Sequence, residues 1–134
     1  MPQTIVAYLS TAIVFFGLDF VWLSVMGGTF YRSALGEMMA DKPNLPVAGV
    51  FYLVYVAGLV YFAVSPALAS GSWTTALIAG AVLGFVAYGT YDITNLATLR
   101  NWPVSVTVVD LAWGTCVTGF SATMGYLITR WISG

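Results

Sequence analysis

Residues 88–114, YGTYDITNLATLRNWPVSVTVVDLAWG, decide the fold of this 134-residue chain. The stretch places Asp92 and Asp110 in two segments that are otherwise apolar enough to lie in lipid, joined by a short polar turn around Arg100. A third acid, Asp19, lies in the first apolar segment. Carboxylates inside membrane segments are energetically costly and are usually functional. We therefore predict membrane helices whose acidic side chains form a buried site.

The composition indicates a membrane protein along the whole chain. Hydrophobic residues make up 60% of it and charged residues only 7%, whereas about a quarter of the residues of a soluble domain are charged. The mean hydropathy is +0.90, which favours a polytopic membrane protein. The net charge is -1 and there is no basic tract, so a nucleic-acid partner is not expected.

The residue types that are missing exclude several cofactors. The chain has no histidine, which excludes histidine-box iron sites and ordinary haem ligation. The one lysine, Lys42, lies in a predicted loop, so a retinal Schiff base inside the bundle is excluded as well. The one cysteine, Cys116, cannot form an intramolecular disulfide and is interpreted as a small packing residue. No cofactor is expected.

Four apolar segments are long enough to cross a hydrocarbon core of about 30 Å. Gly27-Gly28 predicts the end of the first span, and residues 29–41 repeat apolar side chains every four positions. That repeat indicates a short amphipathic helix in the interface, with an ordinary structured loop as the alternative. The sequence thus predicts an all-α, polytopic membrane protein: a single domain over residues 1–134, folded as a four-transmembrane-helix bundle with a short interfacial helix between spans 1 and 2. The predicted spans cover residues 4–26, 47–69, 74–96 and 104–131.

Two of the spans carry a face of small and polar residues that should point into the bundle. In the third span, small residues recur every four positions and lead to Tyr88 and Asp92, with Asn95 after them. In the fourth, Asp110 begins a face of glycine, serine and threonine. Small residues let membrane helices approach closely. In the second span, Tyr52 is expected at the interface because it lies near the start of the span.

The three membrane aspartates are expected in one layer of the bilayer. Asp19 lies seven residues before Met26, Asp110 seven after Pro103 and Asp92 five before Ala97, so all are within about 10 Å of the same surface at 1.5 Å per residue. If a divalent ion binds, these three carboxylates are its expected ligands. The side chains expected around the layer are Trp22, Tyr88, Asn95 and Trp113, with Arg32 and Arg100 above it, where they would contact a headgroup or another anion.

A purely structural role is the alternative for these acids. They could accept hydrogen bonds from Tyr, Trp and Thr, or pair with Arg100, and so tie the helices together. Three acids among few deep cations would then leave charge uncompensated, and we favour a functional site.

The distribution of basic residues predicts the orientation. The loop between the first two spans and the turn at 97–103 hold Arg32, Lys42 and Arg100, whereas the other side has only Arg130. Positively charged loops stay in the cytoplasm. Both termini are therefore expected outside, on the periplasmic side of a bacterial inner membrane.

Four motifs carry a resemblance to a known family. They are DFVW at 19–22, YDITNLATL at 91–99, WP at 102–103 and DLAWG at 110–114. In these motifs, and over its whole length, the chain resembles a bacterial family of predicted four-helix inner-membrane proteins described as a domain of unknown function. The resemblance implies a compact multi-pass protein of the bacterial inner (plasma) membrane and supports the choice of site residues. It implies no activity.

Three functions fit these features, and we favour the first. The acidic layer would bind or transport a proton, a cation or a small polar or lipid ligand, and a transporter of this size would need to be a homodimer. The second is a membrane enzyme that modifies a lipid, with the aspartates as general acid and base or as Mg²⁺ ligands. The third is an accessory subunit of a larger membrane complex.

Overall fold

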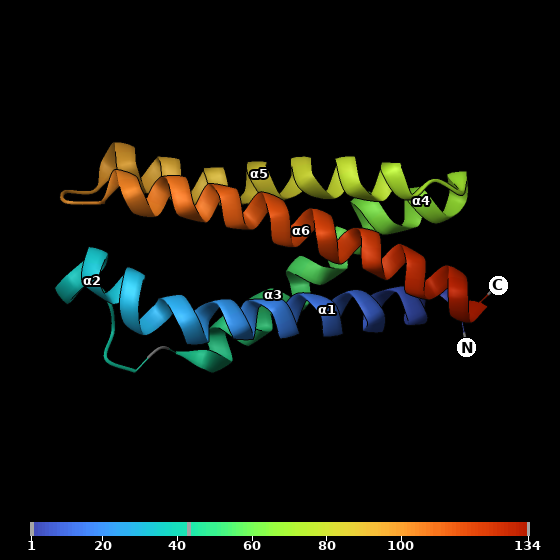
Figure 1. The fold of residues 1–134 in the computed structure, drawn as a ribbon, viewed down its shortest axis with the longest axis horizontal. Coiled ribbons are helices and arrows are strands. Elements are labelled where there is room, and N and C mark those ends of the chain that lie inside the picture. Colours follow the sequence, from blue (N-terminus) through green and yellow to red (C-terminus); the bar gives the residue numbers. More distant parts are fainter. Residues whose placement is uncertain (1, 43, 134) are drawn as a thin grey trace.

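The computed structural model describes residues 2–42 and 44–133, and in these ranges the regular structure is helical throughout. Four helices are long and apolar enough to cross a membrane: Gln3–Met38, Leu45–Ser70, Trp73–Thr98 and Val104–Ser133. The predicted all-α polytopic bundle is confirmed. The two chain ends lie at one end of the bundle, and the turn between the two later spans lies at the other (Figure 1).

The first span continues through the glycine pair that was expected to end it. Helix α1 (Gln3–Met26) is followed without a break by a π-turn, η1 (Gly27–Tyr31), then by α2 (Arg32–Leu35) and a 3₁₀ turn, η2 (Gly36–Met38). Adjacent glycines let the backbone widen into a π-turn without steric cost. The segment expected as a separate interfacial helix over 29–41 is therefore, up to Met38, the continuation of the first helix. The α-helix ends at Gly36, whose φ of 58° suits glycine.

The second span is also interrupted by a π-turn. It consists of α3 (Leu45–Leu59), η3 (Val60–Val64) and α4 (Ser65–Ser70). The side chain of Asn44 caps its start by accepting a hydrogen bond from the Val47 amide at 3.2 Å. Pro66 explains the widening, because proline has no amide hydrogen and its ring clashes with the carbonyl four residues earlier. The span ends at Gly71 in the left-handed conformation.

Helices α5 (Trp73–Thr98) and α6 (Val104–Ser133) form a closely packed hairpin. A Cβ atom at Gly80 would lie 2.9 Å from the Cβ of Ala122, so only glycine allows this approach. Another face of α6 packs against α1, where a Cβ at Gly125 would overlap Thr11. Helix α6 is therefore the centre of the bundle, and its small, polar face lies inside, as predicted from its spacing.

Helix α3 runs obliquely to the others (Figure 1). It packs against α1, whereas the second span contacts α5 chiefly through η3 and α4. Phe15, Val56 and Leu59 are fully buried in the core near the crossing. The first half of α3 consequently diverges from the α5–α6 hairpin on the side of the α5–α6 turn.

Candidate functional site

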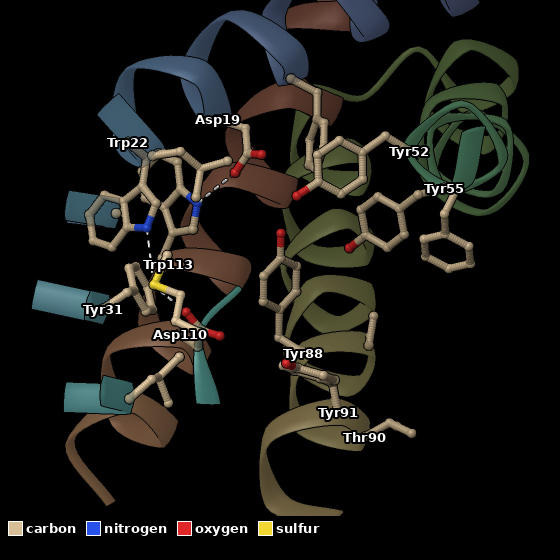
Figure 2. A pocket seen from close by; sticks show the side chains of 17 residues that line it. Asp19, Trp22, Tyr31, Tyr52, Tyr55, Tyr88, Thr90, Tyr91, Asp110 and Trp113 are labelled. Carbon is tan, nitrogen blue, oxygen red and sulfur yellow. Dashed lines mark hydrogen bonds between the residues drawn. The ribbon is translucent and has the colours of Figure 1, made fainter. Parts of the chain in front are cut away.

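A cavity of about 650 Å³ lies where α3 diverges from the α5–α6 hairpin. Its walls come from α1, η1, α2, α3, α5 and α6, with Met39 from the following loop, so every span contributes. Most of the lining is aromatic or aliphatic, and two carboxylates, Asp19 and Asp110, interrupt it. Figure 2 shows these acids on one side of the cavity and a group of tyrosines on the other.

The π-turn η1 brings Tyr31 into the cavity wall. In an uninterrupted α-helix, at about 100° per residue, Tyr31 would point about 120° away from Asp19. A single π-turn absorbs one extra residue, which reduces this angle to about 20°. The structure accordingly places Asp19, Trp22 and Tyr31 together around the cavity (Figure 2). Turns of this kind often occur at functional sites.

Two indole rings connect the acids. Trp22 donates from Nε1 to the Tyr31 hydroxyl at 3.1 Å, and that hydroxyl donates to Oδ1 of Asp110. Trp113 donates from Nε1 to Oδ1 of Asp19 at 3.4 Å. The rings of Trp22 and Trp113 are stacked with their centroids 4.2 Å apart. One rigid assembly of α1, η1 and α6 therefore holds both carboxylates.

Three tyrosines face the acids from the opposite wall. The hydroxyls of Tyr52, Tyr55 and Tyr88 point toward one another on this side of the cavity (Figure 2). Tyr55 is fixed by a hydrogen bond of 2.9 Å to Oγ1 of Thr118, and its ring contacts that of Tyr88 edge to face at 6.4 Å between centroids. Tyrosine combines an apolar ring with a polar tip, so this wall can contact both parts of an amphipathic ligand.

Gly114 determines where Tyr88 lies. A methyl group at Gly114 would overlap the Tyr88 ring. The absence of a side chain at this glycine therefore lets an aromatic ring of α5 lie directly against the backbone of α6.

Asp92 lies behind the cavity wall. Its side chain is 0% exposed, and neither carboxyl oxygen has a hydrogen-bond partner among residues 2–42 and 44–133. The carboxyl group neighbours that of Asp110 on the facing helix. Asp110 is half-buried and lines the cavity, so this acid connects the buried carboxyl to the open space.

The structure gathers only part of the expected site. Asp19, Trp22, Tyr88, Asp110 and Trp113 line the cavity together. Asp92 and Asn95 do not line it, and Asn95 is half-buried on α5. Arg32 is exposed and lies outside the cavity, and Arg100 contributes to a separate groove of about 400 Å³ beside η2.

Three lining residues, Tyr31, Tyr52 and Tyr55, were not among the predicted site residues. Tyr31 was assigned to an interfacial helix, and only recognition of the Gly27-Gly28 pair as a possible π-turn could have revealed its position. Tyr52 was expected at the interface because of its place near the start of the second span. Its position in the cavity wall follows from the oblique course of α3, for which the sequence carries no visible signal.

The three aspartates named as ligands for a divalent ion, should one bind, do not lie together as one cluster. In the described ranges, no group of three His, Cys, Asp or Glu side chains is close enough to hold a metal ion. Asp19 and Asp110 each have a hydrogen-bond donor from an aromatic residue instead. Both carboxylates thus lie in a cavity whose other lining residues are mostly aromatic or aliphatic.

The comparison with known proteins agrees with the fold. The family described as "Predicted membrane protein (DUF2177)" matches residues 4–127. No curated protein and no solved structure matches the chain. The matched residues contain all four spans up to the last turns of α6 and every residue of the cavity wall. With nearly its whole length covered, the chain belongs to the DUF2177 family of predicted membrane proteins.

Proposed function

We propose that this protein binds a lipophilic organic cation in the cavity between its four spans. One observation supports this most directly: Asp19 and Asp110 both line an aromatic cavity to which, among the described residues, no lysine or arginine contributes. A positively charged ligand would supply the missing countercharge. Burying a carboxylate without such compensation is costly.

The aromatic walls favour an organic cation over a metal ion. Trp and Tyr rings attract cations to their faces, and the attraction grows when water is excluded. The stacked pair of Trp22 and Trp113 and the facing tyrosines offer several such rings around the two acids. A cavity of about 650 Å³ lies within the range typical of small-molecule sites.

Entry from the lipid phase fits the exposure of the cavity wall. Phe51 on α3 and Tyr91 on α5 both line the cavity, yet they are 61% and 57% exposed. The cavity thus reaches the outer surface of the bundle at these two helices. A lipophilic cation dissolved in the bilayer would enter there without crossing a polar loop.

We place the protein in a bacterial inner membrane with both termini on the periplasmic side. The excess of basic residues at the end of the bundle that holds η2 and the α5–α6 turn supports this orientation. The cavity would then open in the cytoplasmic half of the bilayer, since Met39 and the end of the first helix help to line it.

A pair of ions with the same shape tests the charge preference. Tetraphenylphosphonium and tetraphenylborate differ essentially in the sign of their charge. Purified protein in lipid nanodiscs should bind the phosphonium ion, with quenching of tryptophan fluorescence, and should not bind the borate. Empty nanodiscs correct for partitioning into lipid. Equal binding of both ions, or of neither, would reject the proposal.

Two variants locate the binding. Asp110→Asn should weaken phosphonium binding at least about tenfold, equivalent to about 1.4 kcal/mol, because it removes one countercharge from the cavity wall. Asp41→Asn is the matched control, since Asp41 is an exposed loop residue outside the cavity. If both substitutions have the same effect on the affinity, the cation does not bind at Asp110.

A further inference from the structure

Asp92 is a buried carboxyl group without hydrogen-bond partners. It is 0% exposed, and both of its oxygens lack a partner in the part of the chain that the structure describes. Unpaired ionised groups are rarely tolerated in such surroundings, and a carboxyl group there takes up a proton instead. The neighbouring acceptor is the carboxyl group of Asp110.

Two carboxyl groups can form a hydrogen bond with each other only if one of them carries a proton. Without that proton both are acceptors, and their charges repel. Oδ1 of Asp110 already accepts a hydrogen bond from Tyr31, which leaves its other oxygen for Asp92. A single proton between the two groups satisfies the buried oxygens and removes one negative charge from the pair.

We infer that Asp92 and Asp110 share one proton in the ligand-free protein, and that a cation arriving at Asp110 from the cavity releases it. The shared proton follows from the burial of Asp92, its unpartnered oxygens and the neighbouring carboxyl group of Asp110. Its release by a cation rests on the proposed function. On binding, the O–H bond of the shared proton breaks and the proton passes to water, while the carboxylate pairs with the cation. One positive charge enters and one leaves, so the charge of the site is unchanged.

The groups facing this pair are consistent with one shared proton. From η1, Tyr31 donates to Asp110, and Trp22 on α1 holds Tyr31 in place. Asp19 on α1 faces the same cavity and has its own donor in Trp113. On α5, Tyr91 directly precedes Asp92 and Asn95 follows it by three residues, and in the turn after α5 the side chain of Arg100 is exposed. None of these groups donates a hydrogen bond to Asp92.

Infrared spectroscopy tests the shared proton without any ligand. A protonated carboxyl group absorbs above about 1700 cm⁻¹, where a carboxylate does not. The difference spectrum of wild type minus Asp92→Asn at pH 7 should contain this band, since Asp110 keeps the Tyr31 donor and borders the cavity. Wild type minus Asp41→Asn should not contain it. Absence of the band from the first spectrum would overturn the inference.

Proton release tests the coupling. In weakly buffered detergent solution, wild-type protein should release about one proton per bound tetraphenylphosphonium ion, and its affinity for the ion should rise about tenfold per pH unit between pH 6 and 8. Asp92→Asn, an isosteric change, should still bind the ion but release no proton and show a flat pH dependence.

The outcomes separate the two proposals. Binding without proton release by the wild type would overturn the coupling and leave the proposed function standing. Failure to bind tetraphenylphosphonium at all would overturn the proposed function, and with it the coupling, while the infrared band still decides whether the proton is shared. Gel filtration shows whether Asp92→Asn folds. If it does not, the number of protons released by the wild type and the pH dependence of its affinity test the coupling on their own.

Discussion

The indole rings of Trp22 and Trp113 lie face to face, with their centroids 4.2 Å apart and their planes within 6° of each other. Each ring donates its N–H to a different partner, Trp22 to Tyr31 and Trp113 to Asp19. Because Tyr31 in turn donates to Asp110, the stacked pair links the two carboxylates of the cavity. A change at one acid can therefore affect the other through this pair.

The stacked indoles should give an exciton couplet in the circular dichroism spectrum. Trp22→Phe should abolish the couplet and destabilise the protein by about 0.5–1.5 kcal/mol beyond the loss of buried area, as for other aromatic pairs. Trp73→Phe is the control, because Trp73 is an exposed residue at the start of α5, outside the cavity. A couplet that persists in Trp22→Phe would show that the rings are not stacked.

Gly114→Ala should destabilise the protein because the new methyl group would overlap the Tyr88 ring. Overpacking of this kind costs about 1–3 kcal/mol. In a Tyr88→Ala background the methyl group has room, so the additional cost of Gly114→Ala should fall to nearly zero. Reversible unfolding in mixed micelles measures all four proteins of the cycle.

Gly17→Ala is the matched control for that cycle, since a Cβ atom at Gly17 has no atom within 4 Å. It should leave stability unchanged or raise it slightly, because alanine favours the helix over glycine. Additive effects of Gly114→Ala and Tyr88→Ala would contradict the contact between the two residues.

Cysteine labelling tests the proposed topology. In a Cys116→Ser background, cysteines at Ser72 and at Asn101 should react from opposite sides of the membrane. The turn at Ser72 precedes α5 and the turn at Asn101 follows it, so this one membrane-spanning helix separates the two positions. An impermeant reagent should reach Ser72→Cys from the periplasm and Asn101→Cys only after the membrane is permeabilised. Labelling of both positions from one side would reject the four-span arrangement.

The sequence predicted the spans and part of the site because both follow from helical periodicity. Apolar length identifies four helices regardless of how they pack. The spacing of Asp19 and Trp22 puts them on one face, and that of Asp110 and Trp113 does the same on α6. Each pair lies within one uninterrupted α-helix, so ordinary helical geometry was sufficient to bring them to the cavity.

Residues beyond an irregular turn could not be placed in this way. Tyr31 follows the π-turn η1, and one absorbed residue rotates everything after it by about 100° relative to ordinary helical spacing. Tyr52 depends on the tilt of α3, which results from packing against the other helices and not from its own sequence. Asp92 has the same periodicity as Tyr88, but the close contact of α5 and α6 buries it behind the cavity wall.

The π-turn can be tested by changing the length of the first helix. Deleting Gly28 should convert η1 into an ordinary α-turn while Tyr31 keeps its direction, because the π-turn holds one residue more than the α-helix requires. Inserting an alanine between Gly27 and Gly28 should instead rotate Tyr31 by about 100° and break its hydrogen bonds to Trp22 and Asp110. We expect the deletion to bind tetraphenylphosphonium within about threefold of wild type and the insertion to bind at least about tenfold more weakly, a difference of about 1.4 kcal/mol from wild type. Tryptophan fluorescence of the ligand-free proteins gives an independent measure, since only the insertion should alter the surroundings of Trp22. If the deletion proves as damaging as the insertion, the extra residue does not serve to orient Tyr31.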